Sequence, residues 1–319
     1  MMAARVLAIL TASLILAILV FGDRDIPPDV LEERYANEAS RFVELADGTR
    51  AHIRDQGIRD GEVLVLVHGS NASLHTWEPW VALLGDSFRL ITLDLPGHGL
   101  TGRTPGDDYS ADSMAGFVDE VTRKLGAARF HLAGNSMGGR VAWRYALDHP
   151  ERLDKLILID ASGFPAPPGF EESLGFRLAV TPGVQQLMLF ITPRPIFAAS
   201  LRDAFSDPAF VTDEMVMRYH ELQLREGSRR ASLVRYQLPP DDPRIGEIAG
   251  IRAPTLVLWG ENDRLIPVAD AQRFESAIPD CRVRIYPGVG HVPMQEAAAA
   301  SAADVAAFLR GEPWGRPQS

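Results

Sequence analysis

The stretch Phe130-His131-Leu132-Ala133-Gly134-Asn135-Ser136-Met137-Gly138-Gly139 leads from an apolar strand, through a glycine-flanked serine, into residues suited to a helix. A Gly-x-Ser-x-Gly sequence in this context predicts a turn so tight that the serine adopts a strained backbone conformation. Gly134 and Gly138 lack the Cβ atoms that would clash in such a turn. The turn exposes the hydroxyl of Ser136 at the positive N-terminus of the following helix. The stretch therefore predicts that Ser136 is a nucleophile.

Apolar runs with the length of strands recur on both sides of this turn. Continuous apolar runs are typical of strands buried on both faces of a parallel sheet. Between them lies helical spacing, such as that of Met114, Phe117, Val118 and Val121. The sequence predicts a hairpin over 41–45 and 50–54, followed by strands over 62–67, 89–93, 130–133, 156–159, 255–258 and 283–286. This alternation predicts an α/β fold with a mostly parallel central sheet of about eight strands, flanked by helices.

The order of these segments divides the chain into a core, an insertion and two short ends. We expect the core in two parts, residues 41–162 and 241–311, because residues 163–240 contain short helical stretches and no convincing strand. That insertion holds seven of the fourteen phenylalanines, so we interpret it as a helical cap over an apolar site. The alternative is a set of packed helices without a role in substrate choice. Residues 23–40 are expected to be a linker, and residues 312–319 a C-terminal tail.

A serine hydroxyl needs a base to take its proton, and the base needs an acid that fixes its tautomer. Among eight histidines, His291 lies in a glycine-rich loop directly after the last expected strand. Asp263 follows the preceding strand, which gives the chain order Ser136, Asp263, His291. Asp160 and Glu261 are alternative acids, and Asp160 is the closer competitor.

The negative oxygen of a tetrahedral intermediate needs two backbone N–H donors. One is expected from Met137, next to the nucleophile. The other is expected from Ser70, in the loop after the first parallel strand, with Asn71 as a weaker possibility. His68 and His98 lie in glycine-rich loops at the same edge, where a structural role is expected for both.

Together these pieces resemble the α/β-hydrolase superfamily over about residues 40–310. The motifs that carry the resemblance stand in the family's order, namely His68-Gly69, Asp94-Leu95-Pro96-Gly97-His98-Gly99, the serine turn, Gly260-Glu261-Asn262-Asp263 and Gly290-His291. The resemblance implies a serine hydrolase with a triad of Ser136, Asp263 and His291.

Within the superfamily, the Gly-Asn-Ser-Met-Gly-Gly turn is similar to that of meta-cleavage-product hydrolases, which break carbon–carbon bonds in vinylogous diketones. Those enzymes hold the substrate carboxylate with a cap arginine, for which Arg218 is our candidate against Arg177, Arg194 and Arg202. They also carry an aromatic residue after the catalytic histidine, where this chain has Val292. Substrate contacts are expected from Asn71, Arg218 and Val292.

The first functional expectation is hydrolysis of a small or medium apolar carboxylic ester through an acyl-enzyme. Cleavage of carbon–carbon bonds by the same triad is the alternative. A third hypothesis is a silent binding protein, because a fold alone does not guarantee activity. The sequence leaves the acyl and alcohol groups and the oligomeric state open.

Composition limits the partners and cofactors. A formal net charge of −10 disfavours binding to a nucleic-acid backbone. The one cysteine, Cys281, permits neither an intramolecular disulfide nor a cysteine zinc cluster. We expect no metal site, and without a Gly-x-Gly-x-x-Gly motif after a strand we expect no nucleotide or other cofactor.

The N-terminal residues 1–22 are distinct from the rest of the chain. From Val6 to Phe21 they are apolar apart from two hydroxyl residues, with Arg5 before the run and acidic residues after it. A membrane span needs roughly 20 residues and the core of a signal peptide roughly 7–15, so this run falls between the two. We expect a membrane anchor over residues 6–21 with the catalytic domain outside the cytoplasm. The alternative is a secreted or periplasmic protein after signal cleavage.

Overall fold

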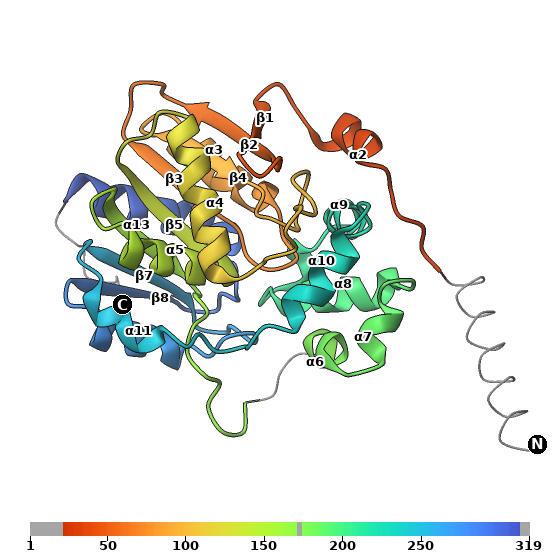
Figure 1. The fold of residues 1–319 in the computed structure, drawn as a ribbon. Helices are drawn as coiled ribbons and strands as arrows, with labels where there is room; N and C mark the ends of the chain where they lie inside the picture. Colours follow the sequence, from red (N-terminus) through yellow and green to blue (C-terminus); the bar gives the residue numbers. More distant parts are fainter. Residues whose placement is uncertain (1–21, 171–173, 313–319) are drawn as a thin grey trace, which may run out of the picture.

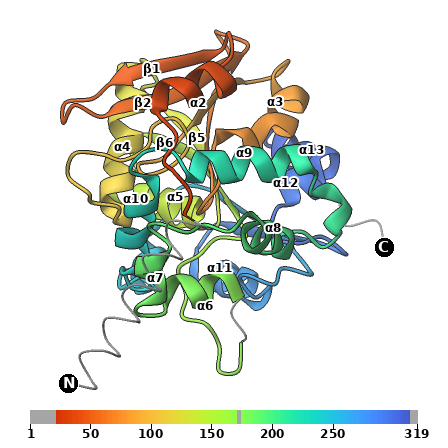
Figure 2. The same ribbon diagram turned by 90° about the vertical axis from the view of Figure 1, so that its right-hand side faces the viewer.

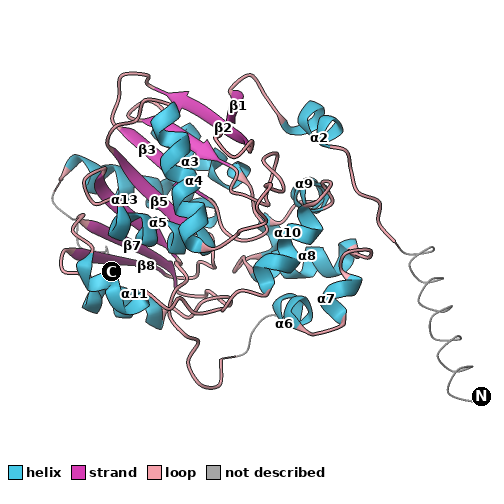
Figure 3. Ribbon diagram, viewed as in Figure 1, coloured by secondary structure: helices cyan, strands magenta, loops and turns pink. Residues whose placement is uncertain are grey.

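The computed structural model describes residues 22–170 and 174–312, in which eight strands form one sheet of order β1-β2-β4-β3-β5-β6-β7-β8. The strands are β1 (Ser40–Glu44), β2 (Arg50–Gly57), β3 (Val63–Val67), β4 (Arg89–Leu93), β5 (Phe130–Asn135), β6 (Leu153–Ile159), β7 (Thr255–Gly260) and β8 (Cys281–Tyr286) (Figure 3). β2 pairs antiparallel with β1 and β4, and all other neighbours are parallel. The predicted α/β fold is confirmed.

Helices cover both faces of the sheet because successive side chains of a strand point to opposite sides. Val65 and Val67 of β3 join one buried cluster, whereas Leu64 and Leu66 join the other. The first cluster lies under α4 (Ala111–Lys124), α5 (Met137–Asp148) and α11 (Ala269–Ala277). The second lies under η1 (Leu74–Trp77), α3 (Glu78–Leu84), α12 (Pro293–Glu296) and α13 (Ala298–Arg310) (Figure 1).

Between β6 and β7 the chain leaves the sheet and forms a group of helices that we call the cap. Its elements are α6 (Leu174–Val180), α7 (Val184–Leu187), α8 (Arg194–Asp203), η2 (Pro208–Phe210), α9 (Asp213–Gln223) and α10 (Ser228–Tyr236). The chain returns to the core through η3 (Ile245–Gly250). Figure 1 shows the cap gathered on the right of the molecule, beyond the end of β5, and Figure 2, which is seen from that side, shows the cap helices in front of the sheet. The loops after the parallel strands therefore face the cap.

Residues 23–40, interpreted from the sequence as a linker, are ordered against the cap. They include α2 (Pro28–Tyr35), in which Leu31 is fully buried. Before this helix, the N–H of Ile26 donates to the Leu224 carbonyl at 2.8 Å. Arg34 in α2 pairs with Glu221 of α9 at 2.5 Å. The linker interpretation missed these contacts because their partners are distant in the sequence.

The expected membrane attachment is corrected. Within residues 22–170 and 174–312, no helix combines the length and apolar character that crossing a membrane requires. The expected anchor, residues 6–21, lies outside the described residues, and its length is below the roughly 20 residues of a span. We withdraw the prediction of a membrane-anchored protein with its catalytic domain outside the cytoplasm.

Candidate active site

Ser136 occupies the turn between β5 and α5 with φ 56° and ψ −119°. Positive φ is rare for a residue with a side chain and is typical of functional turns. A Cβ on Gly134 would lie 2.1 Å from the Gly138 carbonyl oxygen, and a Cβ on Gly138 would lie 2.3 Å from that of Val67. Both glycines are therefore required by close backbone contacts, as the sequence predicted.

The imidazole of His291 contacts the carboxylate of Asp263. His291 Nδ1 and Asp263 Oδ2 are 2.7 Å apart, and both side chains are buried. The other oxygen of Asp263 accepts the N–H groups of Leu265 at 2.7 Å and Ile266 at 3.1 Å. Because the carboxylate only accepts, Nδ1 carries the hydrogen of a neutral imidazole and Nε2 is the basic atom.

Asn135, the residue before the nucleophile, fixes the histidine loop to the turn. Its Nδ2 donates to the carbonyls of Ile159 at 3.2 Å and His291 at 3.1 Å. Ser136 and His291 both line one cavity. Sequence reasoning did not identify Asn135, because the position is variable within the Gly-x-Ser-x-Gly motif and the partner lies far along the chain.

The two alternative acids have other contacts. Glu261 is exposed and accepts the N–H of Gly288 at 3.2 Å. Asp160 is buried at the end of β6 and accepts the N–H of Gly260 at 2.9 Å. The structure therefore gives the hydrogen bond with His291 to Asp263, the acid that chain order favoured.

The two expected oxyanion donors both border the nucleophile. Met137 is the first residue of α5, so its N–H has no acceptor within the helix. Ser70 lines the cavity, and a Cβ on the preceding Gly69 would lie 3.0 Å from the Cβ of Ser136. The loop after β3 thus passes directly against the serine, where an N–H can face a developing negative oxygen.

His68 holds this loop in place. Its Nδ1 donates to the Gly69 carbonyl at 2.7 Å, and its Nε2 accepts the N–H of Leu95 at 3.0 Å. This pattern requires the neutral ring, and burial lowers the pKa of His68 in agreement with it. The structural role expected for His68 fits these contacts.

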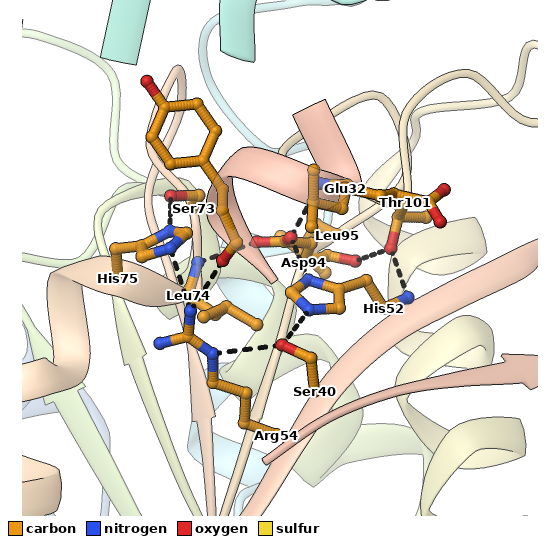
Figure 4. Close-up of polar contacts among 12 residues, drawn as sticks. Glu32, Ser40, His52, Arg54, Ser73, Leu74, His75, Asp94, Leu95 and Thr101 are labelled. Carbon is orange, nitrogen blue, oxygen red and sulfur yellow. Dashed lines mark hydrogen bonds and ion pairs between the residues drawn. The ribbon is translucent and has the colours of Figure 1, made fainter. Parts of the chain in front are cut away.

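A second chain of hydrogen bonds fixes the loops after β3 and β4 (Figure 4). Asp94 accepts the N–H groups of Leu74 at 2.7 Å and Leu100 at 2.8 Å, and contacts His52 Nδ1 at 2.7 Å. His52 Nε2 lies 2.9 Å from Ser40 Oγ. Burial favours a raised pKa for Asp94, but hydrogen bonding and charge interaction with His52 keep that pKa below its ordinary value. Ser40, His52 and Asp94 are the residue types of a catalytic triad, but the two backbone N–H groups that Asp94 accepts indicate a structural role.

Asn71, expected to contact substrate, connects the loop after β3 to the cap. It has φ 56°, its Nδ2 donates to the Tyr236 hydroxyl at 2.6 Å, and its Oδ1 accepts from Arg235 at 2.6 Å. Arg235 also donates to His98 Nε2. Burial, followed by the charge of Arg235, lowers the pKa of His98 well below its ordinary value, which keeps Nε2 an acceptor. These bonds join α10 to the loop that carries Ser70.

A cavity of about 870 Å³ lies between the cap and the nucleophile. Ser136, Asn71, His291 and Val292 line it together with apolar cap side chains that include Met188, Ile191, Phe197 and Leu201. Arg218 is absent from the lining and pairs instead with Glu78 of α3 at 3.4 Å. The structure therefore does not place Arg218 at the cavity where the sequence expected it to contact substrate, and that contact stays a prediction. Helix α9 instead turns Tyr219 and Gln223 towards the cavity. The spacing of residues in the sequence does not specify how the helix is rotated about its axis, so it did not predict which side chains face the cavity.

The fold and this site define the protein as an α/β hydrolase with a serine in its nucleophile turn. Residues 62–298 match a family model described as alpha/beta hydrolase fold, so the chain belongs to that family. The predicted family is confirmed.

The names of the similar proteins describe two kinds of hydrolysis, of carbon–carbon bonds and of esters. A Comamonas testosteroni protein, 29% identical over 82% of this chain and 93% of its own length, is named 2-hydroxy-6-oxononadienedioate/2-hydroxy-6-oxononatrienedioate hydrolase. Lipase 3 of a Moraxella strain is 29% identical over 85% of this chain and 84% of its own. A solved structure described as a membrane phospholipase A superposes with a TM-score of 0.74, at 26% identity over 97% of both chains.

The first of these names recurs, for example in Klebsiella pneumoniae and Escherichia coli. The comparisons therefore favour the carbon–carbon alternative over the ester hydrolase expected first. Hydrolase chemistry on an α/β fold is common to both and is supported.

Proposed function

We propose, from the lining of the cavity rather than from the names of the relatives, that this protein is a serine esterase that hydrolyses carboxylic esters with an extended apolar acyl group. The observation that carries this proposal is the cavity of about 870 Å³ at Ser136, whose cap side is formed largely by aliphatic and aromatic side chains. Its volume is near the upper end for small-molecule sites, so the acyl group is larger than acetyl. The similarity to a phospholipase A over 97% of this chain supports an acyl ester as substrate.

In the proposed reaction, Ser136 Oγ attacks the ester carbonyl while His291 Nε2 takes the serine proton. Asp263 keeps the hydrogen on Nδ1 and stabilises the imidazolium that forms. The N–H groups of Met137 and Ser70 bind the negative oxygen of the tetrahedral intermediate. His291 then gives its proton to the leaving alkoxide, and water, activated by the same imidazole, hydrolyses the acyl-enzyme.

Carbon–carbon hydrolysis is a second candidate, favoured by the names of many relatives and by one cavity residue. That chemistry needs a cation for the substrate carboxylate. Arg229 lines the cavity, and its buried Nη1 has no hydrogen-bond partner among the described residues. Its other nitrogens bond to Asp25 and to the Asp23 carbonyl. Arg229 therefore offers the cation that this candidate requires.

Two measurements on the full chain separate these candidates. A fluorophosphonate should label the wild-type protein and not Ser136→Ala, which tests the nucleophile. Turnover of p-nitrophenyl esters from acetate to laurate is then compared with turnover of a dienoic diketone acid. We expect the ester kcat/KM to rise with acyl length. Turnover of the diketone acid alone, abolished by Arg229→Ala, would instead establish the second candidate.

A further inference from the structure

Asp160 is a buried carboxyl next to the proposed acid, and the mechanism above does not use it. Its side chain is fully buried, and its φ of 44° is in the left-handed region. Its Oδ1 accepts the N–H of Gly260 at 2.9 Å, and its own N–H donates to the Leu258 carbonyl at 3.0 Å. Both partners belong to β7, so the carboxyl is fixed against the strand that leads to Asp263.

Asp160 lies within reach of both the acid and the base. Carboxylate oxygens of Asp160 and Asp263 and a ring nitrogen of His291 all lie within 4.8 Å of one another. Asp160 does not line the cavity. Within the part of the chain that the structure describes, its Oδ2 is buried without a hydrogen-bond donor. A buried polar atom without a partner is unfavourable. If Asp160 Oδ2 carries a proton, its O–H can donate a hydrogen bond to the carboxylate of Asp263.

The charges around Asp160 favour the protonated form. Burial, and then the negative charge of Asp263, raise the pKa of Asp160 well above its ordinary value. Glu296 acts in the same direction, and a backbone N–H from β7 opposes them. Tyr286 also faces this carboxyl, and His291 is the nearby group that becomes positive during the reaction. Burial and the neighbouring carboxylates therefore favour a neutral carboxyl at Asp160, beside the carboxylate of Asp263.

We propose that Asp160 is a positioning residue for the triad, with a neutral carboxyl that donates a hydrogen bond to Asp263 and becomes the partner of His291 when Asp263 is removed. This inference rests on the catalytic roles proposed above, but not on the identity of the substrate. Because the bond stabilises the negative charge of Asp263, it also limits how strongly Asp263 attracts a proton onto His291.

The test is the rate at which a fluorophosphonate labels Ser136, which requires no natural substrate. Asp160→Asn keeps a neutral N–H donor and should label within about threefold of wild type. Asp263→Ala should keep partial reactivity, and adding Asp160→Asn should slow labelling at least about tenfold further, since the asparagine has no negative charge with which to stabilise the imidazolium. Asp263→Ala with Asp86→Asn, an exposed site, is the matched control and should behave as Asp263→Ala alone.

A pH profile distinguishes positioning from a merely structural role. Asp160→Ala removes the hydrogen bond, so the acidic limb of the labelling profile should move to higher pH, while Asp160→Asn leaves it in place. With a substrate that turns over, Asp160→Ala should lower kcat and leave KM unchanged, because Asp160 is outside the cavity.

Equal labelling of Asp263→Ala and the Asp263→Ala/Asp160→Asn double variant, with similar melting temperatures, would overturn the inference. An unmoved acidic limb in a folded Asp160→Ala would also overturn it, as would a wild-type protein that is not labelled. If the wild type is labelled but cleaves no ester, the ester assignment fails while this inference is still decided by the labelling rates.

Discussion

The protonation assigned to Asp160 predicts a specific dependence of folding stability on pH. In the folded protein this carboxyl stays protonated above its ordinary pKa of 3.8, whereas in the unfolded chain it ionises there. At this group the folded state then binds more protons than the unfolded state, so the contribution of Asp160 to stability falls as pH rises. The loss is about 1.4 kcal/mol per pH unit between the ordinary and the folded pKa. The Asp160→Asn variant has no carboxyl at this position, so its unfolding free energy does not show this decrease with pH.

The quantity to measure is the difference in unfolding free energy between Asp160→Asn and wild type at several pH values above 5. Buried His68, His75 and His98 have lowered pKa values, so they make both proteins more stable as pH rises towards 6.5. That contribution is common to both and cancels in the difference. Urea denaturation followed by tryptophan fluorescence gives the free energies, since tryptophans are buried in the core.

The difference should grow with pH in favour of Asp160→Asn, whatever its constant offset. The exposed Asp86→Asn should give a flat difference from wild type. A flat difference for Asp160→Asn as well would show that Asp160 is ionised in the folded state, and would refute the reasoning.

Four further substitutions test the turn, a matched helix position, the cap contact and the place of Arg218. Gly138→Ala places a Cβ 2.3 Å from a β3 carbonyl oxygen and should cost at least about 3 kcal/mol of stability in urea denaturation. Gly116→Ala, in the interior of α4 with nothing within 4 Å of the new Cβ, should add roughly 0.5–1 kcal/mol. Tyr236→Phe removes the hydroxyl that Asn71 contacts, so steady-state kinetics should show kcat lowered about fivefold, the equivalent of about 1 kcal/mol. Arg218→Ala, outside the cavity, should leave ester kcat/KM within about twofold of wild type, and a large loss would restore Arg218 as a substrate contact.

The sheet and the nucleophile turn were predictable because each leaves a local signal. A strand buried on both faces is a continuous apolar run, and β3, β5, β6 and β7 all appear where such runs occur. The turn at Ser136 requires glycines at fixed positions, so its motif is visible without any knowledge of the rest of the fold. His291 and Asp263 follow from the same logic, since each comes directly after a strand and the carboxyl ends of parallel strands share one edge.

The contacts that failed prediction depend on orientation or on partners far along the chain. Helix α2 buries one leucine, Leu31, and makes polar contacts with α9, so its own sequence carries little hydrophobic periodicity. Arg218 was chosen for its charge and its place in the cap, but the rotation of α9 directs it to Glu78. Asn135 joins two loops that the sequence separates by more than a hundred residues. Secondary-structure propensity depends on residues that are close in the sequence, so it does not predict contacts between residues that are far apart.

These distant contacts make the cap part of the active site rather than a separate cover. Through Asn71, helix α10 is bonded to the loop that carries Ser70. Through the Ala204 carbonyl, which accepts the N–H of His291 at 2.8 Å, the end of α8 is bonded to the histidine loop. A displacement of either helix breaks a bond that orients the oxyanion donor or the base. In the arrangement that the structure shows, these hydrogen bonds hold the loop of the oxyanion donor and the loop of the base to the cap, so the catalytic geometry depends on the position of the cap helices.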